Sequence, residues 1–464
     1  MKLTKGETLA LIAMAFGVFM DGLDASIVSI ALPSIAESLG TDTSQIAWVT
    51  IMYFMMIAGL MLTFGRIADS GHIKKIYILG FAIFSLSSLA CGLSQDLMTL
   101  VAARAVQGIG AAMIGSVAPM ICVKFLPASK LGIAMSVLIL GGSIGFGSGP
   151  ALGGIIVDIA SWHWAFFINV PIGALAILFA MKALPKDAPG ERSKLDLLGC
   201  SLLFLAVIFG VYVLEMFSDP DQTQICIAMG VGMVAALMLF VVAEKRARHP
   251  ILNVSMFRDW RFDSSMVCYL ILNIGYMGLS YLLPFYITKE LRLNYTSAGL
   301  IMLIPSAVAI VLSLPSGIYA DSHGRRGLSI LSTSCMLFAS IGYFLLTPDM
   351  GWLPFIPIGI LGGVVWGVCG ASVTARIIDL APEKERGMAA SISNFLYYVG
   401  GSIGTALFAS LITYGSDSFG IPVEDLAAEA FMDGYTFSML WAIGISVIAV
   451  FTAWIINEKR IRTS

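Results

Sequence analysis

Three ionisable side chains stand inside long apolar segments, where a charge is costly. Asp21 and Asp24 lie in the first segment and Arg104 in the fourth, with Gln107 three residues after the arginine. A charge inside a membrane costs ~2.5–3.5 kcal/mol on insertion scales, so it normally faces a cavity or a partner. Burial favours the protonated acid, whereas a neighbouring arginine favours the carboxylate. These residues predict a carboxylate that exchanges a proton and is captured or released by Arg104.

The spacing of these residues places the opposite charges at similar depth. Asp24 lies about 12 Å and Arg104 about 10 Å from the outer end of its segment, at a helical rise of 1.5 Å per residue. Asp21 and Asp24 are three residues apart and share a helix face, and Gln107 lies one turn from Arg104. A permanent structural ion pair fits this spacing as well, so both interpretations stand at this point.

Composition places the chain in a membrane. Its 464 residues are 58% hydrophobic and 12% charged, with a mean hydropathy of +0.90, whereas soluble domains have about 25% charged residues. The net charge of -2 provides no basic field for nucleic acid. Seven scattered cysteines without a CxxC or Cys/His cluster predict neither disulfides nor a metal site. No GxxxxGK[ST] loop and no catalytic Ser/His/Asp arrangement occurs, so neither an ATP-driven pump nor an enzyme is expected.

Apolar runs of about 20 residues predict fourteen membrane-spanning helices. They are expected near 8–32, 45–64, 76–93, 97–124, 130–157, 164–183, 196–214, 224–243, 262–288, 296–317, 328–346, 354–378, 386–413 and 433–456. The first run is too long for a typical cleaved signal peptide, so we expect it to be retained as a span.

The lysines and arginines predict the orientation of these spans. Of the 27 such residues, only Lys289 and Arg292 fall on the side opposite the termini, and Arg104 lies inside a span. Because positive residues concentrate on the cytoplasmic side, both termini are expected there.

The two halves of the chain repeat each other. The segment that starts at Gly65 returns at Gly317, and Leu32-Pro33 returns as Leu283-Pro284. Duplicated halves are a common transporter plan. Since the repeat restarts at the ninth span, we expect an N-terminal six-helix bundle in 1–184, a linker with two inserted helices in 185–261, and a C-terminal six-helix bundle in 262–464.

Glycines recur at every fourth position in the fifth predicted span, which allows a neighbouring backbone to pack closely. Pro150 favours a kink there. The second half retains Gly400 and Gly404 but has Thr405 in place of the proline, so the pattern predicts a bending element in the first half, with a static packing seam as the alternative. The residues of this tract are Gly141, Gly145, Gly149, Pro150, Gly153 and Gly154.

Two matching loops on the cytoplasmic side combine a carboxylate with basic residues. A carboxylate here can cap a neighbouring helix, and the cations can pair with it or with anionic lipid. We therefore expect gating contacts that form in one conformation and break in another. The residues are Gly65, Asp69, Gly71, Lys74 and Lys75 in the first half and Gly317, Asp321, Arg325 and Arg326 in the second.

These motifs resemble those of the major facilitator superfamily, in particular its fourteen-span drug:proton antiporter (DHA2-type) branch. The resemblance covers essentially the whole chain and rests on six motifs in order. They are Leu23-Asp24 through Pro33, Gly65 through Lys75, Arg104-Ala-Val-Gln107-Gly108, Gly145 through Gly154, Trp162 through Gly173 with Asn169, and Glu244 through Pro250. Asp21 is not a usual part of the first motif, and His72 departs from the loop motif.

The resemblance implies an all-α polytopic fold and proton-coupled, alternating-access export of drugs or lipophilic compounds, cationic ones in particular. Asp24, with Asp21 as a partner, would take the proton. It further implies a functional monomer in the cell (plasma or inner) membrane that contacts the lipid bilayer, its small-molecule substrate and protons, with no cofactor, metal or nucleic acid. Candidate cavity residues from the second half are Asn273, Tyr276, Trp366, Asn394, Tyr397 and Tyr398.

Two other functions are compatible with parts of this pattern. Export of a natural metabolite, such as an amino acid, fatty acid or siderophore, would use the same fold. A non-transporting receptor or scaffold is less consistent, because no predicted loop exceeds about 20 residues and a receptor needs a partner domain.

Overall fold

Every regular element in the described part of the chain is a helix. The computed structural model describes residues 4–68, 72–125, 131–185, 187, 197–216, 222–246, 259–323, 326–381, 386–421 and 425–455. The helices are α1 (Lys5–Leu39), α2 (Thr43–Ile67), α3 (Ile73–Gly92), α4 (Leu97–Phe125), α5 (Leu131–Ile159), α6 (His163–Phe167), α7 (Asn169–Ala183), α8 (Leu197–Met216), α9 (Thr223–Arg246), α10 (Trp260–Phe285), η5 (Tyr286–Glu290), α11 (Tyr295–His323), α12 (Arg326–Phe344), η6 (Pro348–Met350), α13 (Phe355–Leu380), α14 (Arg386–Gly415) and α15 (Ala428–Ile455).

The predicted all-α membrane fold is confirmed. Twelve helical segments in the described residues are long and apolar enough to cross a membrane, and α6 and α7 together form one of them. Shorter apolar stretches in α8 and α13, Leu198–Leu214 and Phe355–Val368, account for the remaining two predicted spans.

The first helix extends further than its apolar run predicts. It continues through Pro33 to Leu39 and ends at Gly40, whose φ of 60° is left-handed. The Gly40 N–H donates to the carbonyls of Ala36 and Glu37. A proline removes only one backbone donor, and glycine adopts the left-handed conformation without strain, so the helix ends at the glycine.

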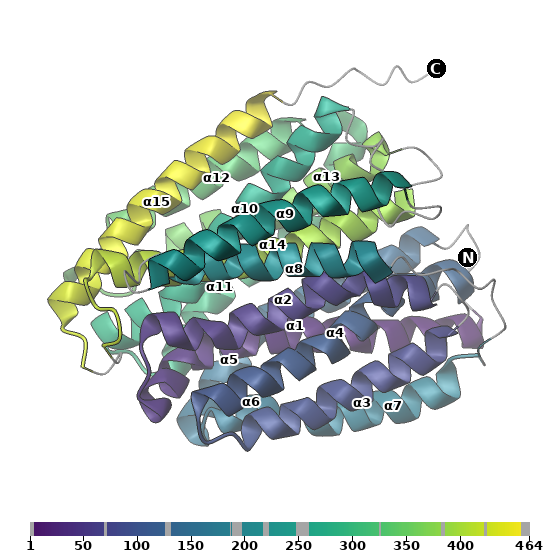
Figure 1. Ribbon diagram of the computed structural model, residues 1–464, viewed down its shortest axis with the longest axis horizontal. Coiled ribbons are helices and arrows are strands. Elements are labelled where there is room, and N and C mark those ends of the chain that lie inside the picture. The colour runs from purple at the N-terminus through teal and green to yellow at the C-terminus, as the bar shows by residue number, and fades with distance from the viewer. Residues whose placement is uncertain are drawn as a thin grey trace.

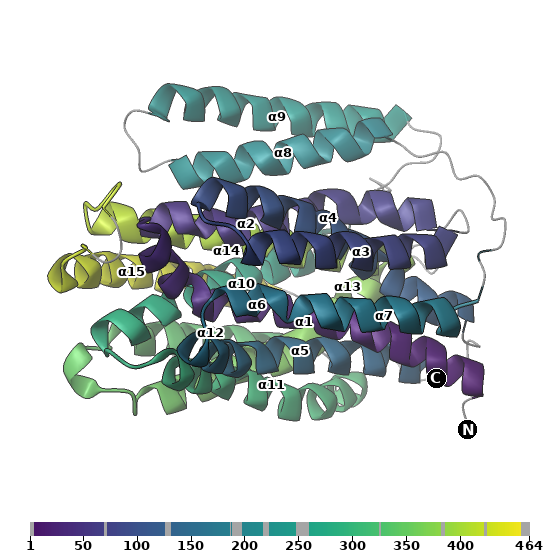
Figure 2. The same ribbon diagram turned by 90° about the horizontal axis from the view of Figure 1, so that it is seen from below.

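The helices form two groups with an added pair. We call α1–α7 the N-terminal group and α10–α15 the C-terminal group. Helix α5 packs on α11 and α2 packs on α14, which joins the two groups. Helices α8 and α9 pack on each other, and α8 rests on α2 and α14, so the pair lies on the outside of the bundle (Figure 2).

Helix α1 begins and helix α15 finishes at the same end of the bundle (Figure 1). We call the opposite end, where α1 finishes and α2 begins, the distal end. There the carboxylate of Asp158 on α5 accepts hydrogen bonds from the backbone N–H groups of Tyr295 (3.1 Å) and Thr296 (2.7 Å), which begin α11. The hydroxyls of Thr43 and Thr413 lie 3.3 Å apart. The two groups are thus held together at the distal end.

The glycine tract of α5 packs against α1. A Cβ at Gly145 would overlap the backbone carbonyl of Phe19, and one at Gly149 would overlap Ser26. Gly154 approaches the backbone of Tyr295 in the other group. Helix α5 continues through Pro150 as one helix. The predicted close packing is therefore present along both faces of α5, whereas the predicted bending stays a prediction.

We predict that Gly145→Ala destabilises the protein, because the added Cβ would push against backbone that cannot rotate away. The expected loss is about 1–3 kcal/mol, as in other overpacked sites. Thermal unfolding of the detergent-solubilised protein measures it. Gly444→Ala is the matched control, since a Cβ at Gly444 on α15 meets nothing within 4 Å. Equal unfolding temperatures for the two variants would contradict the packing argument.

Candidate functional site

Asp24 and Arg104 form an ion pair in the interior of the N-terminal group. Arg104 Nη1 lies 2.6 Å from Asp24 Oδ2, and the two side chains are 1% and 0% exposed. Arg104 Nη1 also donates to Gln107 Oε1 at 2.6 Å, and Arg104 Nε donates to the Val49 carbonyl at 3.0 Å. The structure thus brings together Asp24 and Arg104, which the sequence placed at similar depth, and Gln107, one turn from Arg104.

The second oxygen of Asp24 is bound by two amides. Gln107 Nε2 donates to Asp24 Oδ1 at 2.9 Å, and Asn169 Nδ2, at the start of α7, donates to the same oxygen at 2.6 Å. Both amides also donate to Ser88 Oγ on α3 at 3.0 Å. The buried network therefore links α1, α3, α4 and α7, and satisfied buried networks of this kind fix the arrangement of the helices that supply them.

Aromatic rings cover the guanidinium. Arg104 Cζ lies 4.0 Å from the centre of the Tyr53 ring and 5.8 Å from that of Phe166. A desolvated cation–π contact of this kind is worth about 2 kcal/mol. The Arg104 charge is consequently compensated by the Asp24 carboxylate, the Gln107 and Val49 oxygens and the face of the Tyr53 ring.

Asp21 lies apart from this network, although it is only three residues from Asp24. Its Oδ1 accepts from the Tyr53 hydroxyl at 2.9 Å and its Oδ2 from the Tyr398 hydroxyl at 2.5 Å. Tyr53 belongs to α2, whereas Tyr398 belongs to α14 in the other group. Asp21 is half-buried, and Asp24 is completely buried. The two carboxylates thus face different neighbours, with Tyr53 touching both sites.

Four of the six predicted cavity residues form a continuous aromatic row. The ring centres of Tyr276 and Trp366 are 5.1 Å apart, those of Trp366 and Tyr397 5.7 Å, and those of Tyr397 and Tyr398 5.0 Å. All three pairs are edge-to-face, a favourable geometry for aromatic rings. The row ends at Asp21, because Tyr398 binds it.

The other two predicted cavity residues do not join this row. Asn273 is buried on α10, and its amide donates to the Tyr269 carbonyl one turn earlier at 2.7 Å. Asn394 is exposed on α14, one turn before Tyr398.

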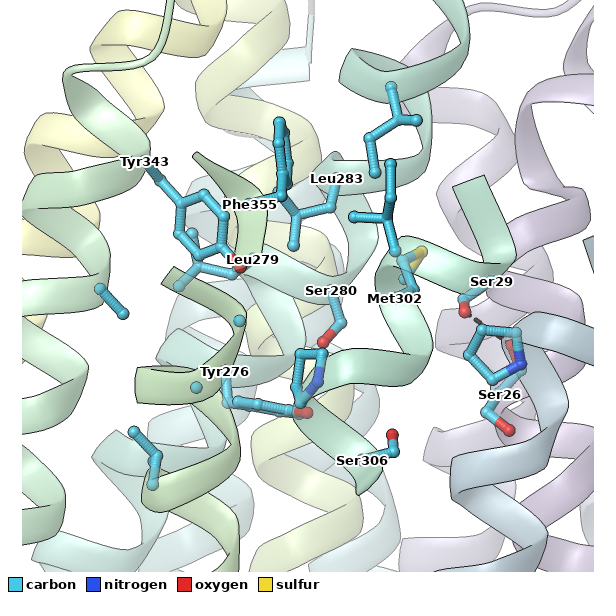
Figure 3. A pocket seen from close by; sticks show the side chains of 18 of the residues that line it. Ser26, Ser29, Tyr276, Leu279, Ser280, Leu283, Met302, Ser306, Tyr343 and Phe355 are labelled. Carbon is cyan, nitrogen blue, oxygen red and sulfur yellow. Dashed lines mark hydrogen bonds between the residues drawn. The ribbon is translucent and has the colours of Figure 1, made fainter. Parts of the chain in front are cut away.

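A pocket lies where α1 and α5 meet α10, η5, α11, α12 and α13 of the C-terminal group (Figure 3). Its cavity volume is about 50 Å³ in this conformation, which is smaller than a drug-sized ligand needs. Ser26 and Ser29 lie on one side, and Tyr276, Ser280 and Tyr343 on the other. Apart from Ser306, the rest of the lining is apolar or glycine, and no charged residue contributes to it among the residues that the structure describes.

The predicted gating loops are described only in part. Asp69, Gly71 and Arg325 lie outside the described residues, and so does the side chain of Asp321. Gly65 and Gly317 lie near the ends of α2 and α11. Arg326 Nη2 donates to the Trp454 carbonyl at 3.0 Å, which fastens α12 to α15.

The basic residues of the first loop join α3 to the end of α7. The carboxylate of Asp187 accepts from the backbone N–H groups of Lys74 (2.7 Å) and Lys75 (3.1 Å) at the start of α3. Lys74 Nζ in turn donates to the carbonyls of Met181 (2.6 Å) and Leu184 (2.7 Å). Each helix end is thus capped by a charge of the favourable sign.

Sequence reasoning missed several members of the site. Asn169 belongs to a recognised motif, but nothing in its local sequence indicates that its amide reaches Asp24. Ser88 and Tyr53 are ordinary residues of apolar spans, so only the packing of α2 and α3 on α1 and α4 identifies them. Asp187, in the connection after α7, could have been noted as a carboxylate beside a basic loop.

An all-helical membrane bundle of two groups, with a charged network inside one group and a pocket between them, defines a membrane transporter. The chain belongs to the Major Facilitator Superfamily, whose profile matches residues 14–405. The transporter class and the predicted absence of an enzymatic role agree with this assignment.

Named relatives match most of the chain. The riboflavin transporter RibZ of Clostridioides difficile is 29% identical over 417 residues, covering 88% of this chain and 90% of the relative. The putative multidrug resistance protein MdtD of Salmonella paratyphi A is 28% identical over 460 residues, covering 96% of this chain and 94% of the relative. A bacterial homologue of the human lysosomal transporter Spinster, crystallised in an inward-facing and unoccupied conformation, has a TM-score of 0.71 at 14% identity, covering 98% of each chain.

We predict that Asp24→Asn destabilises the protein strongly, because it leaves the Arg104 charge buried without its partner. Breaking a buried ion pair costs about 3–5 kcal/mol. The double variant Asp24→Asn/Arg104→Gln buries no unpaired charge and should recover much of this loss. Thermal unfolding of the three proteins in one detergent makes the comparison. A single variant as stable as the wild type would show that the ion pair is not structural.

Proposed function

We propose that the protein exports lipophilic compounds by exchanging them for protons, with the two helical groups rocking about the pocket between them. The observation that carries the proposal is this pocket, because its lining comes from both groups and is mainly apolar and aromatic. Motion of one group against the other changes the side from which such a site is reached, as in alternating access.

The driving force proposed is the proton gradient. Each proton that enters across a potential of 100 mV supplies about 2.3 kcal/mol, enough for a roughly fifty-fold substrate gradient before any pH difference. The α1 carboxylates supply groups that can take up this proton. We place both termini on the cytoplasmic side of the cell membrane and take the monomer as the functional unit, without a cofactor.

The pocket lining bears on the chemistry of the substrate. Hydroxyls of Ser26, Ser280 and Tyr343 offer hydrogen bonds, whereas no lining residue offers a counter-charge. A substrate with an apolar body and a few polar groups fits this lining. A cationic group on the substrate would instead find its counter-charge at α1, beyond the aromatic row of Tyr276, Trp366, Tyr397 and Tyr398.

A natural metabolite is the second candidate substrate. It is favoured by the uncharged, hydroxyl-bearing lining of the pocket and by the relative that is named a riboflavin transporter. The relative named a multidrug resistance protein favours the first candidate. Both candidates use the same fold and the same pocket.

We predict that proteoliposomes containing the purified protein accumulate a lipophilic cationic dye such as ethidium only under an imposed pH gradient. Ser280→Phe should reduce the rate at least about tenfold, because a ring would fill the pocket and each 1.4 kcal/mol of lost binding is a factor of ten. Ser280→Ala is the matched control and should reduce the rate far less, because it removes one hydroxyl without filling the pocket. An absence of gradient-dependent uptake by the wild-type protein would contradict proton-coupled dye export.

The two substrate classes are distinguished by ligand-induced stabilisation. A ligand at 100 times its Kd raises stability by about 2.7 kcal/mol, so thermal unfolding with a panel of dyes and a panel of metabolites, riboflavin included, ranks them. We predict stabilisation by the dyes that is lost in Ser280→Phe. Stabilisation by a metabolite alone, lost in the same variant, would replace the first candidate with the second.

A further inference from the structure

The two carboxylates of α1 differ in what neutralises them. Asp24 is completely buried, and its ion pair with Arg104 lies wholly inside the N-terminal group. Asp21 is half-buried, and no lysine or arginine forms an ion pair with it among the described residues. A half-buried carboxylate without a counter-ion is the one of the two that a proton reaches more readily.

The hydrogen bond between Tyr398 and Asp21 crosses from one group to the other. The Tyr398 hydroxyl on α14 donates to Asp21 Oδ2 on α1 at 2.5 Å, and the ring of Tyr398 packs on Phe54 of α2 with centres 6.0 Å apart. A hydrogen bond to an ionised group is roughly twice as strong as one between neutral groups. The contact between groups therefore depends on whether Asp21 carries its charge.

The other groups around Asp21 are tyrosines, Arg104 and Asp24. Tyrosine hydroxyls ionise only near pH 10, and Asp24 accepts hydrogen bonds from three donors. Helix α5 presents Gly142 and Phe146 to this turn of α1, and neither ionises. The titratable or charged neighbours are Asp24 on α1, Tyr53 on α2, Arg104 on α4, Tyr397 and Tyr398 on α14 and, behind Tyr398, Tyr269 on α10.

An aromatic surface connects the pocket with Asp21. Tyr276 lines the pocket and begins the row of edge-to-face rings that ends at Tyr398. Aromatic faces attract cations. A substrate whose apolar body occupies the pocket can therefore direct a cationic group along this row toward Asp21.

We propose that Asp21 is the carboxylate that exchanges the proton, and that its hydrogen bond from Tyr398 holds the two groups together while Asp21 is ionised. This inference rests on the proposed proton-coupled export. The proton comes from water, binds a carboxylate oxygen of Asp21 and returns to water, with no other bond made or broken. Neutral Asp21 loses the charge that strengthens the Tyr398 bond, so the groups can then separate. Asp24 keeps a structural role.

Exchange of substrate for proton follows from this arrangement of Asp21 and Tyr398. An empty, ionised protein stays in the described conformation because the Tyr398 bond is at full strength. Either a proton or the cationic group of a substrate neutralises Asp21 and releases the bond, and the two cannot do so together at one carboxylate. Departure of the empty carrier from this conformation without a proton or a substrate is thereby suppressed.

The test measures separation of the two groups at the distal end as a function of pH. Spin labels at Leu93→Cys and Leu345→Cys report it, since these residues are 65% and 59% exposed and follow the ends of α3 and α12. The background is a variant without the seven native cysteines that retains wild-type transport. Distances are measured by pulsed electron resonance at about pH 5 and about pH 9, because burial can move the titration of a carboxyl group into this range.

In the otherwise unaltered protein, we expect the population with separated distal ends to be larger at low pH. Asp21→Asn should give the same distribution at both pH values. Tyr398→Phe should raise the separated population at high pH by about tenfold, the effect of losing one hydrogen bond to a charged group. Tyr397→Phe, the matched control, should behave like the wild type, because its hydroxyl does not contact Asp21. Asp24→Asn/Arg104→Gln should retain the pH response.

A wild-type pH response in Asp21→Asn, or its loss in Asp24→Asn/Arg104→Gln, would overturn the assignment to Asp21. No pH response in the wild type would overturn it as well. These outcomes are separate from failure of the proposed export. If the pH response depends on Asp21 but the protein transports no dye, dye export alone is refuted. If Asp21→Asn still transports dye under the pH gradient with the coupling of dye to protons unaltered, the role of Asp21 alone is refuted.

Discussion

The ion pair between Asp24 and Arg104 is the constraint around which the N-terminal group is organised. Two charges removed from water cost several kcal/mol each, and they are tolerated only when their remaining polar atoms are also paired. Helices α3 and α7 supply those partners through Ser88 and Asn169, and α2 contributes the Tyr53 ring and the Val49 carbonyl. Their positions follow from the need to satisfy one buried pair. The group can consequently move as a unit.

The contacts between the two groups are of a different kind. They include the packing of α5 on α11 and of α2 on α14, the capping of α11 by Asp158, and the hydrogen bond from Tyr398 to Asp21. The two polar contacts lie at the boundary between the groups, outside the network around Asp24. The proposed alternating access requires contacts at this boundary to break while that network stays intact. The charge on Asp21 decides the strength of one of these contacts.

Much of the fold could be predicted from the sequence, because a membrane-spanning helix needs about 20 apolar residues and the chain supplies fourteen such runs. The pairing of Asp24 with Arg104 could be predicted as well, because isolated charges in lipid need partners at equal depth. The different surroundings of Asp21 and Asp24 could not. Helical spacing places both residues on one face, but which neighbours they meet depends on how α2 and α14 pack against α1. Tyr398 is remote in sequence and identical in type to Tyr397, so no local signal distinguishes the two tyrosines.

In the proposed mechanism, substrate and proton compete for Asp21 while Asp24 remains paired. This competition is measured as the release of protons when a lipophilic cation such as tetraphenylphosphonium binds the detergent-solubilised protein in a weakly buffered solution at a pH where Asp21 is partly protonated. We expect proton release from the wild type and from Asp24→Asn/Arg104→Gln, and none from Asp21→Asn, with binding verified in each case. Undiminished proton release from Asp21→Asn would contradict this mechanism.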